Sequence, residues 1–179
     1  MIIGYQGIKG AFSYITCKAL YPNEKIVNFT SFTEVFEALE NSKINIGVIP
    51  IKNSYAGNVD ETNKLMQKYN YKIIKKIEIP IKQNLAGIYT TELKEITHIF
   101  SHKQALLQCK TKIKTILPNA ILIEKGNTAI SADFVSKSNN NHYACICSQE
   151  AIREYNLITL VKNFQDKEDN TTLFVAISK

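Results

Sequence analysis

Side chains that could bind or activate a small ligand follow an apolar run in the stretch IGVIPIKNSYAGNV, residues 46–59. The run is followed by Lys52, Asn53 and Ser54, and then by a glycine at position 57. A hydroxyl, an amide and a glycine are typical of a helix cap and a turn, because small polar side chains accept hydrogen bonds from the free N–H groups of a helix start. The same groups, with an ammonium beside them, also suit an anionic ligand.

A glycine-rich turn, GYQGIKGAFS, lies between the first predicted strand and the first predicted helix. Gly4, Gly7 and Gly10 do not have the GxGxxG spacing of a dinucleotide-binding loop, so the sequence does not predict a Rossmann site. Glycines let backbone amides approach a ligand closely, and the helix that starts near Ala11 presents free N–H groups that attract anions. Taken alone, the turn is explained by close packing of a helix on a strand.

The stretch FSHKQALLQC, residues 100–109, places polar groups at the start of another helix. Ser101 can cap that helix, and Gln104 and Gln108 share one face because they are spaced i and i+4. Gln108 falls among apolar neighbours, where an amide needs a partner, so we expect either a half-buried structural glutamine or a ligand contact. His102 is expected to be structural, because no carboxylate or second histidine lies near it in sequence to orient it.

Two further turns have the same character. In GNTAISADF, Asn127 or Thr128 can cap the helix, and in DNTTLFVAIS a charged loop enters the last strand through Asn170, Thr171 and Thr172. Capping or edge pairing explains each turn alone. Five such turns on one α/β frame nevertheless predict a site, since open α/β sheets bind ligands at the carboxyl ends of their strands. It would be rich in hydroxyls, amides and helix N-termini, would suit a small dicarboxylate, and would lack metal ligands and a Ser-His-Asp set.

Composition and charge favour an ordinary globular protein of 179 residues. Apolar residues make up 45% and charged residues 21%, which is typical of that class. The net charge is +6, but only one of the 22 basic residues, Arg153, is an arginine. Because proteins that read nucleic acids favour arginine forks, we expect a solvated basic surface and no nucleic-acid partner.

The cysteines and the N-terminus indicate a cytoplasmic protein. Cys17, Cys109, Cys145 and Cys147 form no CxxC pair, and the last two share one face of the predicted strand YACIC. We therefore expect buried free thiols in a reducing compartment. The first ten residues lack the charged start and long apolar stretch of a signal peptide, and no apolar run approaches the length of a membrane span.

Short apolar, β-rich runs alternate with amphipathic stretches along the whole chain, which predicts α/β layers. Strands are expected over MIIGY, KIVNF, INIGVIPI, HIF, AILIE, YACIC, LITLVKNF and TTLFVAI. Helices are expected over AFSYITCKALY, SFTEVFEALE, VDETNKLMQKY, HKQALLQCKTKIKTIL, NTAISADFVS and QEAIREY. The second of these helices begins with a capping box, Ser31 with Glu34 three residues later.

Two extended segments cross between similar halves of the chain, one near residues 77–83 and one near residues 164–166. Two strands that link two α/β lobes form a hinge, and a hinge implies a cleft. We therefore expect a first lobe made of residues 1–78 and 165–179 and a second lobe made of residues 79–164, around a central cleft.

The stretches GYQGIKGAFS, GVIPIKNSYAGNV, SHKQALLQC, NTAISA and EYNL followed by NTTLFVAI resemble, in order and spacing, the motifs of the prephenate dehydratase family. The resemblance spans essentially the whole chain. It implies two α/β lobes around a cleft, like type II periplasmic binding proteins, and conversion of prephenate to phenylpyruvate, water and CO2 in phenylalanine biosynthesis. It also implies that no cofactor is needed and that the protein forms a homodimer or a homotetramer.

The resemblance assigns roles to individual positions. The threonine of the family's Thr-Arg-Phe motif falls on Thr172, which would donate a proton to the leaving hydroxyl. Thr128 falls in the small-residue turn expected to meet a carboxylate of the substrate. The polar positions that would bind or orient the substrate are Asn53, Ser54, Ser101 and Gln108.

Three positions depart from the family pattern. Lys52 replaces the glutamate of Pro-Ile-Glu-Asn-Ser, Leu173 replaces the arginine of Thr-Arg-Phe, and Lys103 replaces the proline of Ser-His-Pro. Because losing one member of a buried ion pair leaves a charge uncompensated, we hypothesise that the first two replacements are linked. Lys52 would then supply the substrate with a cation, although it is no substitute for a guanidinium fork, or it would point into water.

Two other functions are compatible with these residues. An enzyme that decarboxylates prephenate without aromatising it would also depart from Thr-Arg-Phe, as this chain does at Leu173, and a non-catalytic binding module could have kept only the cleft. Retention of Thr172 and of Asn53 with Ser54 favours dehydration. The last strand is followed directly by Lys179, which predicts that the chain lacks the family's phenylalanine-sensing ACT domain and its feedback in cis.

Overall fold

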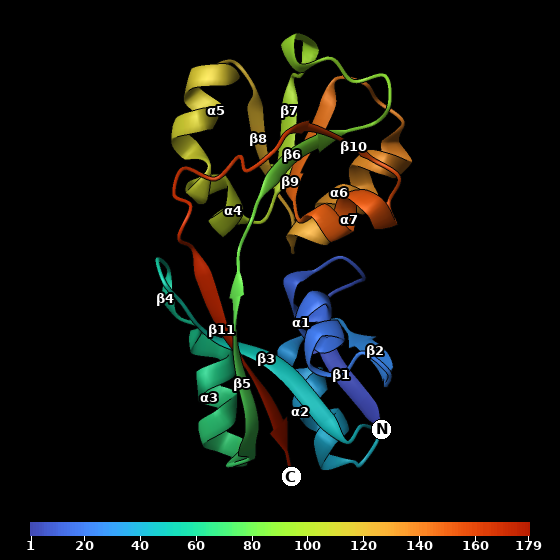
Figure 1. The fold of residues 1–179 in the computed structure, drawn as a ribbon, viewed down its shortest axis with the longest axis vertical. Helices are drawn as coiled ribbons and strands as arrows, with labels where there is room; N and C mark the ends of the chain where they lie inside the picture. Colours follow the sequence, from blue (N-terminus) through green and yellow to red (C-terminus); the bar gives the residue numbers. More distant parts are fainter. The chain divides into compact units, whose positions relative to one another are not determined.

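The computed structural model describes residues 1–179, and the chain divides into two compact units, each with its own sheet (Figure 1). Unit 1 comprises Met1–Ile8, Phe12–Ile81 and Asn170–Lys179. Unit 2 comprises Lys9–Ala11 and Lys82–Asp169. The two-unit α/β architecture expected from the sequence is therefore confirmed.

The chain passes between the units later in the sequence than predicted, between residues 81 and 82 and between residues 169 and 170, and residues 9–11 lie in unit 2 rather than in the predicted first lobe. Backbone pairing explains the shift, because the N–H of Ile81 donates to the carbonyl of Asn170 at 2.8 Å and keeps both residues with unit 1. On the other side, Phe164 is fully buried in the core of unit 2, and its N–H donates to the carbonyl of Gln83.

The sheet of unit 1 has the strand order β2-β1-β3-β11-β5, with the short strand β4 paired to β3. Its strands are β1 (Ile2–Gln6), β2 (Lys25–Phe29), β3 (Ile46–Asn53), β4 (Gly57–Asn58), β5 (Lys72–Pro80) and β11 (Thr171–Ser178). Strand β1 is parallel to β2 and β3, whereas β11 runs antiparallel to both β3 and β5. The last strand of the chain thus inserts beside the strand that carries the Lys-Asn-Ser stretch.

Helices cover both faces of this sheet. Helix α1 (Phe12–Leu20) packs on one face, and α2 (Phe32–Glu40) and α3 (Asp60–Tyr69) pack on the other. Neighbouring strand residues divide between the two cores: Val48 and Ala176 pack on the α1 side, and Ile49 and Ile177 on the α2 side. This division follows the period of two in a strand and explains why the run IGVIPI is apolar on both faces.

The sheet of unit 2 has the strand order β10-β6-β9-β7-β8. Its strands are β6 (Asn84–Gly87), β7 (His98–Ser101), β8 (Ile121–Glu124), β9 (Tyr143–Cys147) and β10 (Ile158–Val161). Strand β7 is parallel to β8 and β9, so the carboxyl ends of these three strands meet at one edge of the sheet. Strand β6 is antiparallel to β9 and starts at the same edge, with Asn84 opposite Cys147.

The helices of unit 2 are η1 (Leu93–Glu95), α4 (Lys103–Gln108), α5 (Lys110–Ile116), α6 (Thr128–Ser138) and α7 (Gln149–Glu154). The prediction of one continuous helix over HKQALLQCKTKIKTIL is wrong, because the helix is interrupted at Cys109. The carboxylate of Asp166 accepts hydrogen bonds from the N–H groups of Thr111 and Lys112 at 2.9 and 3.0 Å. This contact provides acceptors for the free N–H groups at the start of α5, and no local sequence pattern predicts it.

Two local predictions, the Ser31 cap and the burial of the free cysteines, are confirmed. Ser31 accepts a hydrogen bond from the N–H of Glu34 and caps α2, although the Glu34 carboxylate returns to Thr30 rather than to the cap residue. All four cysteines are free and buried, and the Sγ atoms of Cys145 and Cys147 lie 3.7 Å apart, as expected for two residues on one face of a strand. No helix is long and apolar enough to cross a membrane.

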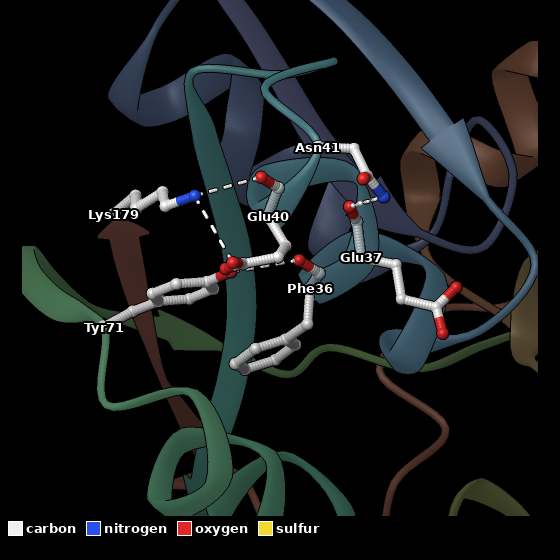
Figure 2. A network of polar contacts seen from close by, with 6 residues as sticks. All are labelled: Phe36, Glu37, Glu40, Asn41, Tyr71 and Lys179. Atoms are coloured by element: carbon white, nitrogen blue, oxygen red, sulfur yellow. Dashed lines mark hydrogen bonds and ion pairs between the residues drawn. The ribbon is translucent and has the colours of Figure 1, made fainter.

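The end of β11 is tied to α2 by a polar network, which Figure 2 shows. The hydroxyl of Tyr71 donates to Glu40 Oε2 at 2.6 Å, and the ammonium of Lys179 contacts Glu40 Oε1 at 3.3 Å and the Glu40 carbonyl at 3.1 Å. The Tyr71 ring stacks on Phe36 with ring centroids 5.8 Å apart. The hydrogen bonds from Tyr71 and Lys179 lower the pKa of Glu40. Burial, and then the bond to Glu40, raise the pKa of Tyr71.

We predict that Tyr71→Phe lowers the Tm at pH 7 by about 2–4 °C, the effect of losing one hydrogen bond in a chain of this size. Tyr69→Phe is the matched control, since Tyr69 packs in the same aromatic group without a hydroxyl bond to Glu40. Calorimetry of both variants checks this. Because the folded pKa of Glu40 is lowered, the difference should shrink as pH falls through that pKa, and a difference that persists in acid would contradict the assignment.

Candidate functional site

The polar residues that follow the apolar run of β3 meet the start of β11 in unit 1. Asn53 and Thr172 are directly opposed in the antiparallel pair, and the register shifts between Leu173 and Phe174. Leu173 pairs with Lys52 but Phe174 pairs with Pro50, so Ile51 is the extra residue of a β-bulge. A bulge reverses which face the following side chains occupy. Without it, Asn53 and Thr172 would extend from opposite faces of the sheet.

The side chain of Asn53 is held in one orientation. Its Oδ1 accepts hydrogen bonds from the backbone N–H groups of Tyr55 and Ala56 at 3.0 and 2.9 Å, which identifies the other side of the amide as the donor. That donor, Nδ2, lies 2.9 Å from Thr172 Oγ1 and 3.0 Å from the Thr171 carbonyl. Asn53 and Thr172 are 9% and 8% exposed, so the pair is nearly withdrawn from bulk water.

Ser54 and Asn170 complete this group, which we call the Asn53 network (Asn53, Ser54, Asn170 and Thr172). Two hydrogen bonds join Ser54 and Thr171 in a two-way clip. The Ser54 N–H donates to the Thr171 carbonyl at 2.9 Å, and the Thr171 N–H donates to the side-chain Oγ of Ser54 at 3.0 Å. Asn170 Oδ1 accepts from Asn53 Nδ2 at 2.8 Å and from Ser54 Oγ at 3.2 Å. Sequence reasoning did not single out Asn170 as a site residue, although it directly precedes the two threonines.

The network determines what Thr172 can do chemically. Its hydroxyl oxygen accepts a hydrogen bond from Asn53 Nδ2, and the hydroxyl hydrogen has no acceptor in the network. The O–H is therefore available to donate to a ligand, while the Asn53 amide would stabilise negative charge on the oxygen once the proton has left. This arrangement is suited to a general acid.

Lys52 and Leu173 lie beside this network but on the other face of the sheet. They are cross-strand partners, so the two positions that depart from the family pattern are direct neighbours, although Lys52 is not buried as the hypothesis of a linked replacement assumed. Leu173 also pairs with Glu78 of β5. Lys52 and Glu78 are exposed and Leu173 is partly buried. Whether Lys52 contacts a substrate stays a prediction.

In unit 2, the predicted residues follow the carboxyl ends of β7 and β8. Ser101 is fully buried and its hydroxyl donates to the Ile146 carbonyl at 2.7 Å, so it joins β7 to β9 and does not cap the next helix as expected. His102 is the cap instead, with Nδ1 accepting from the N–H of Gln104 at 3.2 Å. Gln108 Oε1, at the end of α4, is buried and has no hydrogen-bond partner. An acceptor of this kind is open to a donor from a ligand or from water.

Thr128 is the first residue of α6 and is buried. Asn127, rather than Thr128, provides the cap, with Oδ1 accepting from the N–H of Ile130 at 2.8 Å. The Thr128 hydroxyl makes no capping contact and lies at the start of an eleven-residue helix, where negative charge is favoured. Ser101, Gln108 and Thr128 thus lie in the second unit, each near a strand or helix terminus.

The glycine-rich turn has a structural explanation. Residues Lys9–Ala11 belong to unit 2, where the Gly10 carbonyl accepts a hydrogen bond from the Ser148 hydroxyl at 2.6 Å and the Lys9 carbonyl accepts one from the Tyr155 hydroxyl at 2.9 Å. Gly10 has a φ of +85°, and a Cβ there would lie 2.6 Å from the Cα of Ala151. Both facts require glycine.

The remaining surface features offer few groups that could bind or activate a ligand. A hollow of about 260 Å³ in unit 1 is lined by Phe29, Glu34, Glu37, Ala38, Asn41 and Lys43. It contains none of the predicted site residues, and two of its polar side chains already have partners in their own helix or turn. No group of three or more His, Cys, Asp or Glu side chains could hold a metal ion.

Comparison with known proteins places this arrangement in a class of two-unit α/β proteins. A prephenate dehydratase from Arthrobacter aurescens, solved with L-Phe, superposes with a TM-score of 0.92 at 24% identity, over 100% of this chain and 60% of that one. Immunogenic lipoprotein A from Vibrio vulnificus matches over 99% of this chain and 87% of that one, with a TM-score of 0.55 at 12% identity. At these identities the likeness establishes the fold alone.

Sequence comparison is more specific. The family model for prephenate dehydratase matches residues 3–179, so the chain belongs to the prephenate dehydratase family. The prephenate dehydratase of Lactococcus lactis subsp. cremoris (strain MG1363) is 28% identical over 180 residues, which is 100% of this chain and 64% of that protein. Arogenate dehydratase/prephenate dehydratase 2 of Arabidopsis thaliana is 28% identical over 99% of this chain and 46% of that protein. The chain thus spans about half to two thirds of these relatives.

We predict that His102 makes the stability of the protein depend on pH. Burial lowers the pKa of His102, an effect partly offset by Glu124, so the folded state binds fewer protons than the unfolded state, whose histidine has a pKa of about 6.5. The stabilisation is complete above that value and is lost as pH falls through the folded pKa. The Tm should therefore fall more between pH 7.5 and 5.5 for the wild type than for His102→Asn, which keeps an acceptor at the cap. Equal losses would refute a role for this imidazole.

Proposed function

We propose that the chain catalyses the conversion of prephenate to phenylpyruvate, water and CO2. The observation that carries this proposal is the 2.9 Å hydrogen bond from Asn53 Nδ2 to Thr172 Oγ1, which leaves the threonine proton free to be donated. Membership of the prephenate dehydratase family supplies the reaction class. The reaction needs a proton donor, a route for CO2 to depart and donors that hold two carboxylates.

The atoms and charges balance with one proton. The bond from the ring to its carboxylate breaks, CO2 departs, and the electron pair shifts into the ring as the carbon–oxygen bond to the ring hydroxyl breaks. The departing hydroxide takes the Thr172 proton and leaves as water, and solvent then reprotonates the threonine. Aromatisation makes the overall step downhill, so general-acid help of about a hundredfold or more is a reasonable share for one hydroxyl.

The remaining predicted residues bind or orient the substrate. Asn53 stabilises the oxygen of Thr172 as its proton leaves, and Ser54 holds the start of β11 in place through the two-way clip. In unit 2, we assign a donor role to Thr128 and an acceptor role to Gln108. Ser101 would orient the end of β7 beside the substrate, because its hydroxyl hydrogen is already donated to the Ile146 carbonyl. The unpartnered, buried Oε1 of Gln108 supports its assignment, because such an atom gains a hydrogen bond only from a ligand or from water.

The products formed from a candidate substrate separate the candidate activities. One relative is named for both arogenate and prephenate, so both compounds should be offered to the purified protein. Formation of phenylpyruvate from prephenate supports the proposal. Release of CO2 without an aromatic product would favour the non-aromatising decarboxylase, and binding without turnover would favour a non-catalytic module.

We further propose that the protein acts in the cytoplasm without a cofactor and assembles as a homodimer or homotetramer. The buried free thiols support a reducing location, and the family resemblance supports self-association. Sedimentation velocity at micromolar concentration tests the second point, and a monomer at every concentration would reject it.

We predict that Thr172→Val lowers kcat for prephenate about a hundredfold or more, because the isosteric side chain cannot donate a proton. Thr172→Ser keeps the hydroxyl and should retain activity within about tenfold of the wild type. Thr115→Val, a change on the surface of α5, is the control for loss of a threonine hydroxyl elsewhere. Phenylpyruvate absorbance measures the rates, and an active Thr172→Val enzyme would exclude Thr172 as the acid.

A second prediction concerns Lys52. If its ammonium binds a substrate carboxylate, Lys52→Met should raise KM by about tenfold while kcat changes little, since a charged hydrogen bond of that strength is lost from ground state and transition state alike. Lys76→Met, another exposed lysine of the same sheet, is the matched control. An unchanged KM would assign Lys52 to the solvated surface.

A further inference from the structure

Asn170 is the residue of the Asn53 network to which the family resemblance gave no role, and its environment is unusual. It immediately precedes β11 and is 2% exposed. Its backbone carbonyl accepts from the N–H of Ile81, which fixes the main chain at this point. Its side chain is therefore held from both ends, by the main chain and by the contacts of its amide.

The orientation of the Asn170 amide follows from its neighbours. Asn53 must present Nδ2, because its Oδ1 is already bound to two backbone N–H groups. Only an acceptor can face that Nδ2, so the Asn170 atom 2.8 Å away is Oδ1. The Ser54 hydroxyl donates to the same oxygen at 3.2 Å. The Nδ2 of Asn170 is consequently turned away, where it is buried and has no partner.

A buried amide that satisfies only one of its two ends is costly. An unpaired buried donor loses its hydration without compensation, and native proteins retain few such groups. The orientation of the Asn170 amide therefore leaves its Nδ2 without a hydrogen bond and gives its Oδ1 two. The group that benefits from Oδ1 is Asn53, the residue that donates to Thr172.

We propose that Asn170 is a positioning residue for catalysis: its Oδ1 fixes the Asn53 amide so that Nδ2 is directed at Thr172 Oγ1. This inference rests on the proposed function, because it assigns Asn170 to the same proton donation. Asn53 Nδ2 has two hydrogens for three acceptors, namely Asn170 Oδ1, the Thr171 carbonyl and Thr172 Oγ1. Without Asn170 Oδ1 the amide is held only through its own Oδ1, so its Nδ2 can tilt toward the Thr171 carbonyl and away from the threonine.

The kinetic test is a double-mutant cycle. Asn170→Ala should lower kcat for prephenate by about tenfold to a hundredfold with KM changed less than about threefold, because the interaction matters mainly in the transition state. In an Asn53→Ala background the same change should alter kcat by less than about twofold, since the two residues act as one unit. Asn170→Asp, which keeps the acceptor, should recover most of the lost kcat. Multiplicative effects in the double variant would overturn the proposal.

Asn45→Ala is the matched control for loss of one asparagine at the opposite end of β3. Asn45 Oδ1 accepts from the N–H of Ile2 at 2.8 Å and contacts no member of the network. It should leave kcat unchanged while removing a comparable hydrogen bond. A loss of kcat in Asn45→Ala equal to that in Asn170→Ala would show a general effect of stability and would overturn the positioning role.

A second measurement separates this inference from the proposed function. The side-chain amide signals of Asn53, assigned in 15N–1H spectra by their loss in Asn53→Ala, should exchange with solvent at least about tenfold faster in Asn170→Ala than in the wild type. Asn170→Asp should restore the protection. If the wild type does not convert prephenate, the proposed function fails while this measurement still decides whether Asn170 holds Asn53. Equal exchange in the wild type and Asn170→Ala would overturn the inference.

Discussion

One extra residue in β3 determines what the site of unit 1 can do. The sheet pairs Phe174 with Pro50 but Leu173 with Lys52, and Ile51 bulges out between them. The bulge keeps Val48 on the α1 side, as the core requires, and still places Asn53 on the same face as Thr172. A strand without the bulge could satisfy the core or the site but not both, because side chains alternate strictly between faces.

The same bulge explains the burial of the polar groups. Asn53 and Thr172 occupy a face whose next neighbours are apolar, so their hydrogen bonds are shielded from water. Each polar atom must then find a partner within the protein, and the clip between Ser54 and Thr171 with the Oδ1 of Asn170 provides most of them. Such a network holds its members in place, which suits the proton donation that we propose for Thr172. The cost is the unpaired Nδ2 of Asn170.

Much of this fold could be predicted from the sequence, and the failures have identifiable causes. Strand and helix periodicities identified most elements, though not β4 or η1, and Ser31 identified a cap, because these signals are local. The interruption at Cys109 was not predictable, since Asp166 creates it from a distant part of the chain. The bulge was hidden as well, because a strand that is apolar on both faces shows no alternation to break. The roles proposed for Asn53 and Thr172 came from the family resemblance. The role proposed for Asn170 follows only from its hydrogen bonds in the structure.

The pairing of Leu173 with both Lys52 and Glu78 has a consequence for how the family motif can change. An arginine at position 173 would have a cation on one neighbouring strand and an anion on the other, so β5 already holds its counter-charge. Because Lys52 and Glu78 are exposed, neither single replacement would leave an unpaired charge in the core, so the burial penalty that suggested a linked replacement does not apply here. The two replacements could thus have occurred in either order, and their position as neighbours does not by itself require that they be linked.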